Sequence, residues 1–288
     1  MPPEANGKVG DRGWALVSVL WVLAILALLA AAAQTLTYTS ARGERHLLER
    51  ALLNAALDAG VARAIAGITD ARLDQRWPVD GTPQRFVYDG VTLAISIQDE
   101  TGRIDLNAAD GSLLRQLLAS AGESPDRASA LVDKILDWRS STNLKRLQGA
   151  SDADYAAAGL NYRPRHGAFQ TVDELRLVLG MTPELFAKLR PALTVYSKKP
   201  AIDPNVAPRE ALLAYYPDQP AKVEALLRLR GSSRGGAAGA ALGAEITGSG
   251  HAFSVIVVAT DSSMGRTREA VFALTSSPDK PVLIFNLR

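Results

Sequence analysis

The sequence contains no cysteine among its 288 residues. This absence excludes disulfide bonds, thiolate nucleophiles and metal sites built on sulfur. Histidine is scarce as well: His46, His166 and His251 lie far apart and have none of the spacings of a zinc-binding helix. A nucleophile elbow, a phosphate-binding loop and a dinucleotide-binding glycine pattern are also missing. The sequence therefore predicts no catalytic and no cofactor-binding residues, and an enzyme is the class it favours least.

An excess of one charge is missing too. Lysine and arginine number 32 against 30 acidic residues, which gives a net charge of +2. Proteins that bind DNA or RNA depend on a basic surface to neutralise phosphates. We therefore expect no nucleic-acid partner.

What the sequence does have is a long apolar run near its start. From Trp14 to Ala33 there are twenty residues without a charge, and the next charged residue is Arg42. A helix of about twenty residues rises about 30 Å, the thickness of the hydrocarbon core of a bilayer. Residues 14–41 are therefore predicted to form a transmembrane helix.

This apolar segment has three possible interpretations: a cleaved secretory signal, a permanent anchor, or the retained helix of a type IV prepilin. The apolar part of a secretory signal usually has about 7 to 15 residues. This one is longer, although the alanines at 30–33 could imitate a signal cleavage site. The segment 1–13 ends in Gly13, which is followed at once by Trp14. This junction resembles a prepilin leader, and the resemblance makes Gly13 and Trp14 the site of cleavage and N-methylation by the prepilin peptidase.

Two positions differ from the common prepilin pattern. Trp14 stands where prepilins usually have Phe, and Ser18 stands where they usually have Glu. In pilin filaments that Glu neutralises the new amino terminus of a neighbouring subunit inside the membrane, where an unpaired charge is costly. The topmost subunit of a filament has no such amine to meet. The resemblance therefore makes Ser18 what is expected of a tip subunit, and a serine in a simple anchor is the alternative.

Beyond the apolar run, leucines and alanines recur at helical spacing, which predicts that the helix continues to about Ile68. Asp89-Gly90 lies between two segments of alternating apolar residues and predicts a β-hairpin. The soluble part of the helix and this hairpin make up residues 42–103. Three more strands with short connections are predicted within 251–288, so these strands should be antiparallel.

The residues between these two parts of the sheet show only helical patterns. Ser124 and Pro125 predict the start of one helix in segment 104–230, and Asn107 is expected to cap another. Seven of the twenty residues in 231–250 are glycine, which predicts a flexible loop. The expected fold class is α+β: a long N-terminal helix packed on an antiparallel sheet, with a large all-α insertion.

The insertion contains a weak repeat. The block IDLNAAD at 104–110 returns as IDPNVAP at 202–208, and each block precedes a short helical pattern. Such helix entries, together with the segment around Gly180, resemble helix-hairpin-helix units. In those units a second glycine lets the backbone approach phosphate, but here Met181 follows Gly180. The repeat therefore predicts a packing unit without nucleic-acid binding.

Carboxylates gather in one loop of the insertion. The segment DWRSSTNLKRLQGASDADY contains Asp137, Asp152 and Asp154. Hard cations such as Ca²⁺ bind clusters of carboxylate and carbonyl oxygens. The segment does not follow the EF-hand pattern, and a solvated loop with a helix cap is the alternative. Calcium is the one cofactor that the sequence suggests, and none is required for the expected fold.

Several segments together resemble the protein K family of minor pseudopilins in bacterial type II secretion systems. They are RGWALVSVLWVLAILALLA, DETGRIDLNAAD, ILDWR, DADYAAAGLNYRPRHGAFQTVDELRLVLGMTPELFAKLRPALTVYS and IDPNVAP. The resemblance covers nearly the whole chain. It implies a pilin-like fold and a place at the tip of a short periplasmic pseudopilus, in contact with the I and J minor pseudopilins. It also implies a single pass through the inner membrane and a C-terminal domain in the periplasm. Our hypothesis is that a subunit at the tip meets secreted cargo or the outer-membrane channel.

The resemblance implies a calcium-binding loop in some members, which often have a more acidic run after DWR and a glutamate after Gly-Ala. Here Ser140, Ser141 and Thr142 follow DWR, and Ser151 follows Gly-Ala. This loss of carboxylates argues against calcium in this chain. For the chain as a whole, the alternative to a tip subunit is a membrane-anchored periplasmic binding module outside any filament.

Overall fold

The computed structural model describes most of the chain, namely residues 11–142, 144–232, 251–260, 265–275, 277 and 279–287. The chain divides between Ala55 and Ala56 into two compact parts. Residues 1–10 of the predicted leader and 233–250 of the predicted loop lie outside the described residues.

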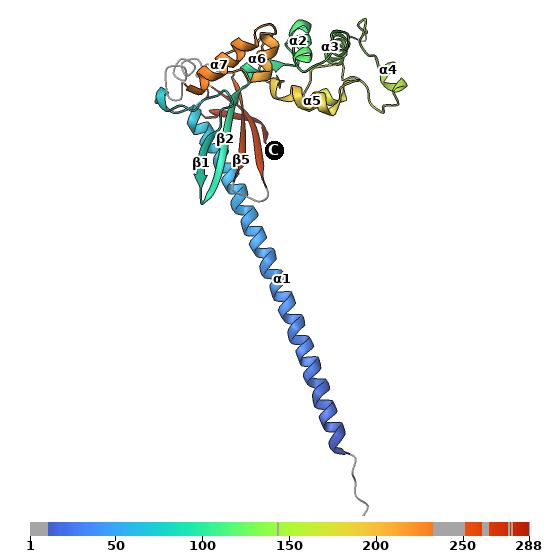
Figure 1. Cartoon of the computed structure of the whole chain (residues 1–288), viewed down its shortest axis with the longest axis vertical. Helices are drawn as coiled ribbons and strands as arrows, with labels where there is room; N and C mark the ends of the chain where they lie inside the picture. Colours follow the sequence, from blue (N-terminus) through green and yellow to red (C-terminus); the bar gives the residue numbers. More distant parts are fainter. Residues whose placement is uncertain are drawn as a thin grey trace, which may run out of the picture. The chain divides into compact units, whose positions relative to one another are not determined.

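A single helix, α1 (Asp11–Ile68), passes through both parts of the chain. No proline lies between Pro3 and Pro78, so nothing in this stretch removes a backbone donor from the helix. The predicted continuation of the apolar helix to Ile68 is thus confirmed (Figure 1).

The second part of the chain contains a five-stranded sheet in which every neighbouring pair is antiparallel. Its order is β1 (Gln84–Tyr88), β2 (Val91–Asp99), β5 (Ala252–Ala259), β6 (Thr267–Leu274) and β7 (Val282–Leu287). The predicted hairpin is confirmed, since Asp89 and Gly90 form its turn with φ values of 45° and 80°. In the central pair, β2 precedes the insertion and β5 follows it. The sheet is therefore complete only when strands from the two sides of the insertion have paired.

The C-terminal end of α1 packs on one face of this sheet. Leu93, Ile95 and Ile97 alternate along β2 toward that face and are fully buried. A Cβ at Gly60 of α1 would lie 2.6 Å from Val257 and 3.3 Å from Leu93, which shows how closely the helix approaches the strands. Glycine at this position therefore sets the distance between helix and sheet.

The insertion between β2 and β5 is almost entirely helical and has one apolar core of its own. A short 3₁₀ helix, η1 (Leu73–Gln75), precedes the sheet. The insertion consists of η2 (Glu100–Gly102), β3 (Ile104–Asp105), α2 (Gly111–Ser120), α3 (Pro125–Arg139), α4 (Asp152–Ala157), η3 (Val172–Leu177), α5 (Pro183–Leu189), η4 (Arg190–Ala192), β4 (Leu193–Thr194), α6 (Arg209–Tyr215) and α7 (Pro220–Ser232). The α+β fold class is confirmed. Helix α7 continues through Gly231 and Ser232, so the helical part extends two residues into the stretch predicted as a loop.

The predicted cap of α2 is wrong. The Asp110 carboxylate, not Asn107, accepts the hydrogen bond from Leu113 N at 2.8 Å, and this bond holds the pKa of Asp110 below its usual value. Asn107 instead pairs with both backbone groups of Phe169. The reason is a turn at Asp105, whose carboxylate accepts from Asn107 N at 2.8 Å and delays the start of the helix.

The sequence repeat corresponds to a repeated backbone contact. Arg139, the last residue of α3, donates from its guanidinium to the carbonyl oxygens of Leu106 and Ala109, the latter at 2.8 Å. These carbonyls belong to the third and sixth residues of the block 104–110. The end of α3 is thereby fixed to the turn that starts α2.

Arg230 in α7 makes the same contact in the second block. Its guanidinium donates to the carbonyl oxygens of Pro204 and Ala207, again the third and sixth residues of the block 202–208. Burial lowers the pKa of both Arg139 and Arg230 from the usual arginine value. Since α2 and α6 also pack on each other, the insertion is built around two similar helix pairs, each closed by one arginine clamp.

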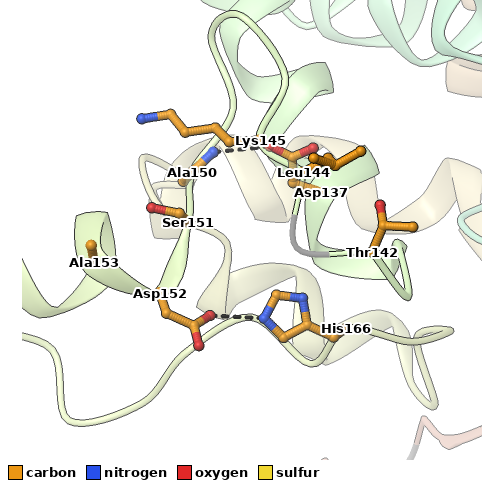
Figure 2. A pocket seen from close by; sticks show the side chains of 9 residues that line it. All are labelled: Asp137, Thr142, Leu144, Lys145, Ala150, Ser151, Asp152, Ala153 and His166. Carbon is orange, nitrogen blue, oxygen red and sulfur yellow. Dashed lines mark hydrogen bonds and ion pairs between the residues drawn. The ribbon is translucent and has the colours of Figure 1, made fainter.

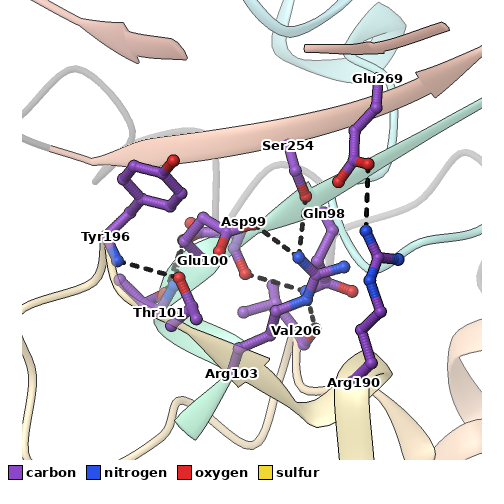
Figure 3. A network of polar contacts seen from close by, with 11 residues as sticks. Gln98, Asp99, Glu100, Thr101, Arg103, Arg190, Tyr196, Val206, Ser254 and Glu269 are labelled. Carbon is purple, nitrogen blue, oxygen red and sulfur yellow. Dashed lines mark hydrogen bonds and ion pairs between the residues drawn. The ribbon is translucent and has the colours of Figure 1, made fainter. Parts of the chain in front are cut away.

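The insertion is held at the end of the sheet where β2 ends and β5 begins (Figure 3). Gln98 donates a 2.7 Å hydrogen bond to the carbonyl oxygen of Val206, and a Cβ at Gly102 would lie 2.6 Å from that same oxygen. Further polar pairs across or beside this junction are Arg103–Glu100, Arg103–Ser254 and Arg190–Glu269. Within this part of the chain, the helices of the insertion lie beyond the C-terminal end of α1 (Figure 1).

Candidate functional site

The first candidate site is the apolar N-terminal stretch of α1. Trp14 and every residue from 16 to 31 are exposed, with Trp14 at 81% and Ile25 at 50%. A helix that is apolar on all sides needs an apolar environment, either a protein core or a lipid bilayer. These exposed side chains fit a chain anchored in the membrane by a single helix.

Length and composition alone select a different stretch. Among the described residues, Leu47–Ile68 is the helix long and apolar enough to cross a membrane, and Leu16–Ala31 is apolar but shorter. However, 44% of the longer stretch is buried, and its residues Leu57 and Ile68 are almost completely so. The apolar face of Leu47–Ile68 is thus used in the protein core, and the exposed stretch remains the better membrane segment.

The predicted processing site lies at the start of α1. Asp11 begins the helix, so Gly13 and Trp14 belong to its first turn. The leader before it falls largely outside the described residues, and cleavage after Gly13 stays a prediction.

The second candidate site is the acidic loop between α3 and α4. Asp137 lies near the end of α3, and Asp152 and Asp154 lie in the first turn of α4. Asp137 and Asp152 line one cavity together with His166 (Figure 2). Asp154 does not line it, so the structure brings only two of the three predicted ligands to one cavity.

Asp137 is buried and is surrounded by donors from the loop. Its carboxylate accepts from the Arg146 guanidinium at 2.7 Å, from Arg146 N at 3.1 Å and from Ala150 N at 3.2 Å. A side chain at Gly149 would collide with its Oδ2 atom. The loop backbone therefore wraps closely around this one carboxylate.

The other two carboxylates also have partners. Lys145 Nζ lies 2.8 Å and 3.0 Å from the two oxygens of Asp154, and this contact is the main reason that the pKa of Asp154 is strongly lowered. Asp154 further accepts from Ser151 N and Ser151 Oγ, each at 2.7 Å, in a capping box in which Ser151 is the N-cap of α4. Asp152 Oδ1 lies 2.8 Å from His166 Nε2.

This arrangement does not fit a bound calcium ion. Among the described residues there is no group of three or more histidine or acidic side chains placed to hold a metal. Calcium requires six to eight oxygen ligands around one point. The carboxylates of Asp137 and Asp154 instead point to separate cations, Arg146 and Lys145.

Sequence reasoning missed the basic partners Lys145, Arg146 and His166. A signal was present, because the basic pair in LKRL lies between the acidic segments DWR and DAD.

Beside the loop, three aromatic side chains of the insertion core pack together: Trp138 stacks on Phe169 with ring centroids 6.1 Å apart, and its ring lies 6.0 Å from that of Tyr155. Burial raises the pKa of Tyr155 to about 12, and its hydroxyl accepts a hydrogen bond from Leu179 N.

Known proteins of type II secretion systems are similar to this chain. The family model described as type II secretion system (T2SS), protein K, matches residues 93–198, which include most of β2 and much of the insertion. The type II secretion system protein K of Pectobacterium carotovorum subsp. carotovorum is 30% identical over 206 residues, covering 63% of this chain and 62% of the relative. That of Klebsiella pneumoniae is 28% identical over 258 residues, covering 77% and 76%. The chain is therefore similar to type II secretion system protein K, both in the family model and in these two relatives.

A solved relative shares the fold. The crystal structure of the GspK-GspI-GspJ complex from enterotoxigenic Escherichia coli matches with a TM-score of 0.57 at 14% identity. The match covers 86% of this chain and 98% of the solved one. The predicted pilin-like fold with a helical insertion is confirmed, and the predicted resemblance to protein K is found in these comparisons. The chain aligns with about 62% of the length of the Pectobacterium relative, somewhat less than two thirds.

Proposed function

We propose that this chain is a minor pseudopilin that caps the tip of the periplasmic pseudopilus and helps to start its assembly for protein export across the outer membrane. The observation that carries the proposal is the position of the insertion, beyond the C-terminal end of α1. In a filament of parallel α1 helices, this is where a further subunit would have to be added. Where the insertion joins the sheet, the backbone at Gly102 lies close to the carbonyl oxygen of Val206.

The proposed partners follow from the comparison with the solved complex. The solved relative was crystallised as a complex named for GspK, GspI and GspJ, which supports the I and J minor pseudopilins as partners here. The prepilin peptidase would cut after Gly13 and methylate Trp14, leaving the apolar helix on the mature chain. The helix would make a single pass through the inner membrane, with the C-terminal domain in the periplasm. The role is mechanical and needs no bond chemistry, and the tip would meet secreted cargo or the outer-membrane channel.

Co-expression tests this proposal. The full chain, carrying an affinity tag and extracted in mild detergent, should purify together with the I and J minor pseudopilins of the same secretion system. We expect one peak on size-exclusion chromatography that contains the three proteins in equal amounts.

The control is the same purification with the major pseudopilin in place of I and J, which should not co-elute in stoichiometric amounts. A chain that elutes alone in the presence of both partners would contradict the proposal. That result would favour a membrane-anchored binding module outside any filament.

A further inference from the structure

We infer that the loop between α3 and α4 is closed by the chain's own cations, Lys145 and Arg146, and that it folds without a divalent metal. The two residues are adjacent in sequence but pair with acids at opposite ends of the loop. Arg146 binds Asp137 at the end of α3, and Lys145 binds Asp154 at the start of α4. Together they form a cation clamp that joins the two helices.

Of the two acids in the cation clamp, Asp137 depends more on protein partners, because only 6% of its side chain is exposed to water. A buried carboxylate is stable only when charged or hydrogen-bonding partners replace the water it has lost. Arg146 supplies both a guanidinium and a backbone N–H, and Ala150 supplies a second backbone N–H. Because the backbone at Gly149 lies against Oδ2, the carboxylate is enclosed by protein groups on that side as well.

Asp154 is satisfied in a different way. Lys145 Nζ contacts both of its oxygens, while Ser151 donates to Oδ2 from its backbone and its hydroxyl. Ser151 directly precedes α4. A hydroxyl here caps the helix and adds no negative charge, so one lysine suffices to neutralise the acid.

The cation clamp and a calcium ion exclude each other. Asp152 pairs with His166 at 2.8 Å, and the Arg163 guanidinium lies 3.8 Å from it. A divalent cation bound among these acids would have to displace Lys145 and Arg146 and would meet their positive charge at close range, where like charges repel strongly. Lys145 and Arg146 therefore already supply the positive charges that pair with these acids, and calcium should not change the stability of the loop.

Thermal unfolding of the full chain in detergent tests the clamp directly. Unfolding is recorded in excess CaCl₂ and in excess EGTA. Calcium held at about 100 times its dissociation constant would raise the melting temperature of a folded part of this size by about 5–10 °C. We expect the same melting temperature in both solutions, and a rise in calcium would overturn the inference.

Substitution of the two cations is the second arm. In EGTA, Arg146→Gln should lower the melting temperature by about 5 °C or more, because Asp137 remains buried with its charged partner removed. Lys145→Gln, at a side chain that is 41% exposed, should lower it by about 1–3 °C and leave the protein folded. Arg146→Lys keeps the positive charge and should recover part of the loss.

The matched control is Arg127→Gln, which breaks an ion pair between a half-exposed arginine and Glu123 (2.9 Å) elsewhere in the insertion. It should change the melting temperature by less than about 2 °C. If Arg146→Gln and Lys145→Gln behave like this control, the loop is not held by the clamp and the inference is wrong. Neither arm involves I or J, so its outcome is independent of the proposed function.

Discussion

Arg139→Ala should lower the free energy of unfolding by about 3 kcal/mol, and Arg230→Ala by a similar amount. Each substitution removes two hydrogen bonds from a charged donor, each worth roughly 1.5–3 kcal/mol. In both cases the acceptors are carbonyls of a block that begins a helix pair, Leu106 and Ala109 for the first arginine. Denaturant unfolding followed by far-ultraviolet circular dichroism measures the loss.

The control for both variants is Arg228→Ala. Arg228 lies in α7 beside the second clamp, but its Nε donates to the carbonyl of Glu224 within the same helix. Its removal should change the free energy of unfolding by about 0.5 kcal/mol or less. Substitution by lysine should give intermediate values at both clamps, because an ammonium cannot match the geometry of the guanidinium fork. Clamp variants as stable as the control would show that the repeat is fixed by its apolar core alone.

Leu23→Arg should release most of the protein from the membrane. Leu23 lies at the middle of Leu16–Ala31, where its side chain is exposed. Replacing leucine by arginine at the centre of a membrane helix costs about 3–4 kcal/mol on insertion scales, a factor of more than about 100 in partition. The fraction of the chain that resists alkaline extraction from membranes measures this effect.

The matched control makes the same chemical change on an exposed leucine of the insertion. Leu229 of α7 is as exposed as Leu23, and Leu229→Arg should leave the membrane fraction unchanged. Equal release by both variants would mean that exposed apolar surface in general, and not the N-terminal helix, holds the protein in the membrane fraction.

The features predicted correctly from sequence are those that depend on local patterns. The charge-free run from Trp14 to Ala33 and the helical spacing after it define one long helix, and Asp89-Gly90 between alternating segments defines the hairpin. The helix start at Ser124 is also confirmed, because its hydroxyl accepts from Arg127 N with Pro125 in the first turn. In each case the pattern that determines the structure is formed by residues close together in the sequence.

The features that were missed depend on which of several possible hydrogen bonds forms, or on partners that are far apart in the sequence. Asn107 looked like a cap, but Asp105 forms a turn by accepting from the backbone N–H groups of Asn107 and Ala108. The helix therefore starts only after Asp110. Asp137 and Asp154 looked like metal ligands, because a list of acids does not show which cation each one meets. The clamp formed by Arg139 joins residues 30 positions apart and becomes visible only once α2 and α3 have packed.

The most direct test of the whole account is the amino terminus of the mature protein extracted from membranes, determined by intact mass and terminal sequencing. The account requires that the apolar helix and the pilin-like domain stay on one chain, so it predicts an N-methylated start at Trp14. A chain that begins near Ala33, with the apolar helix removed, would be a soluble protein and would contradict the tip role.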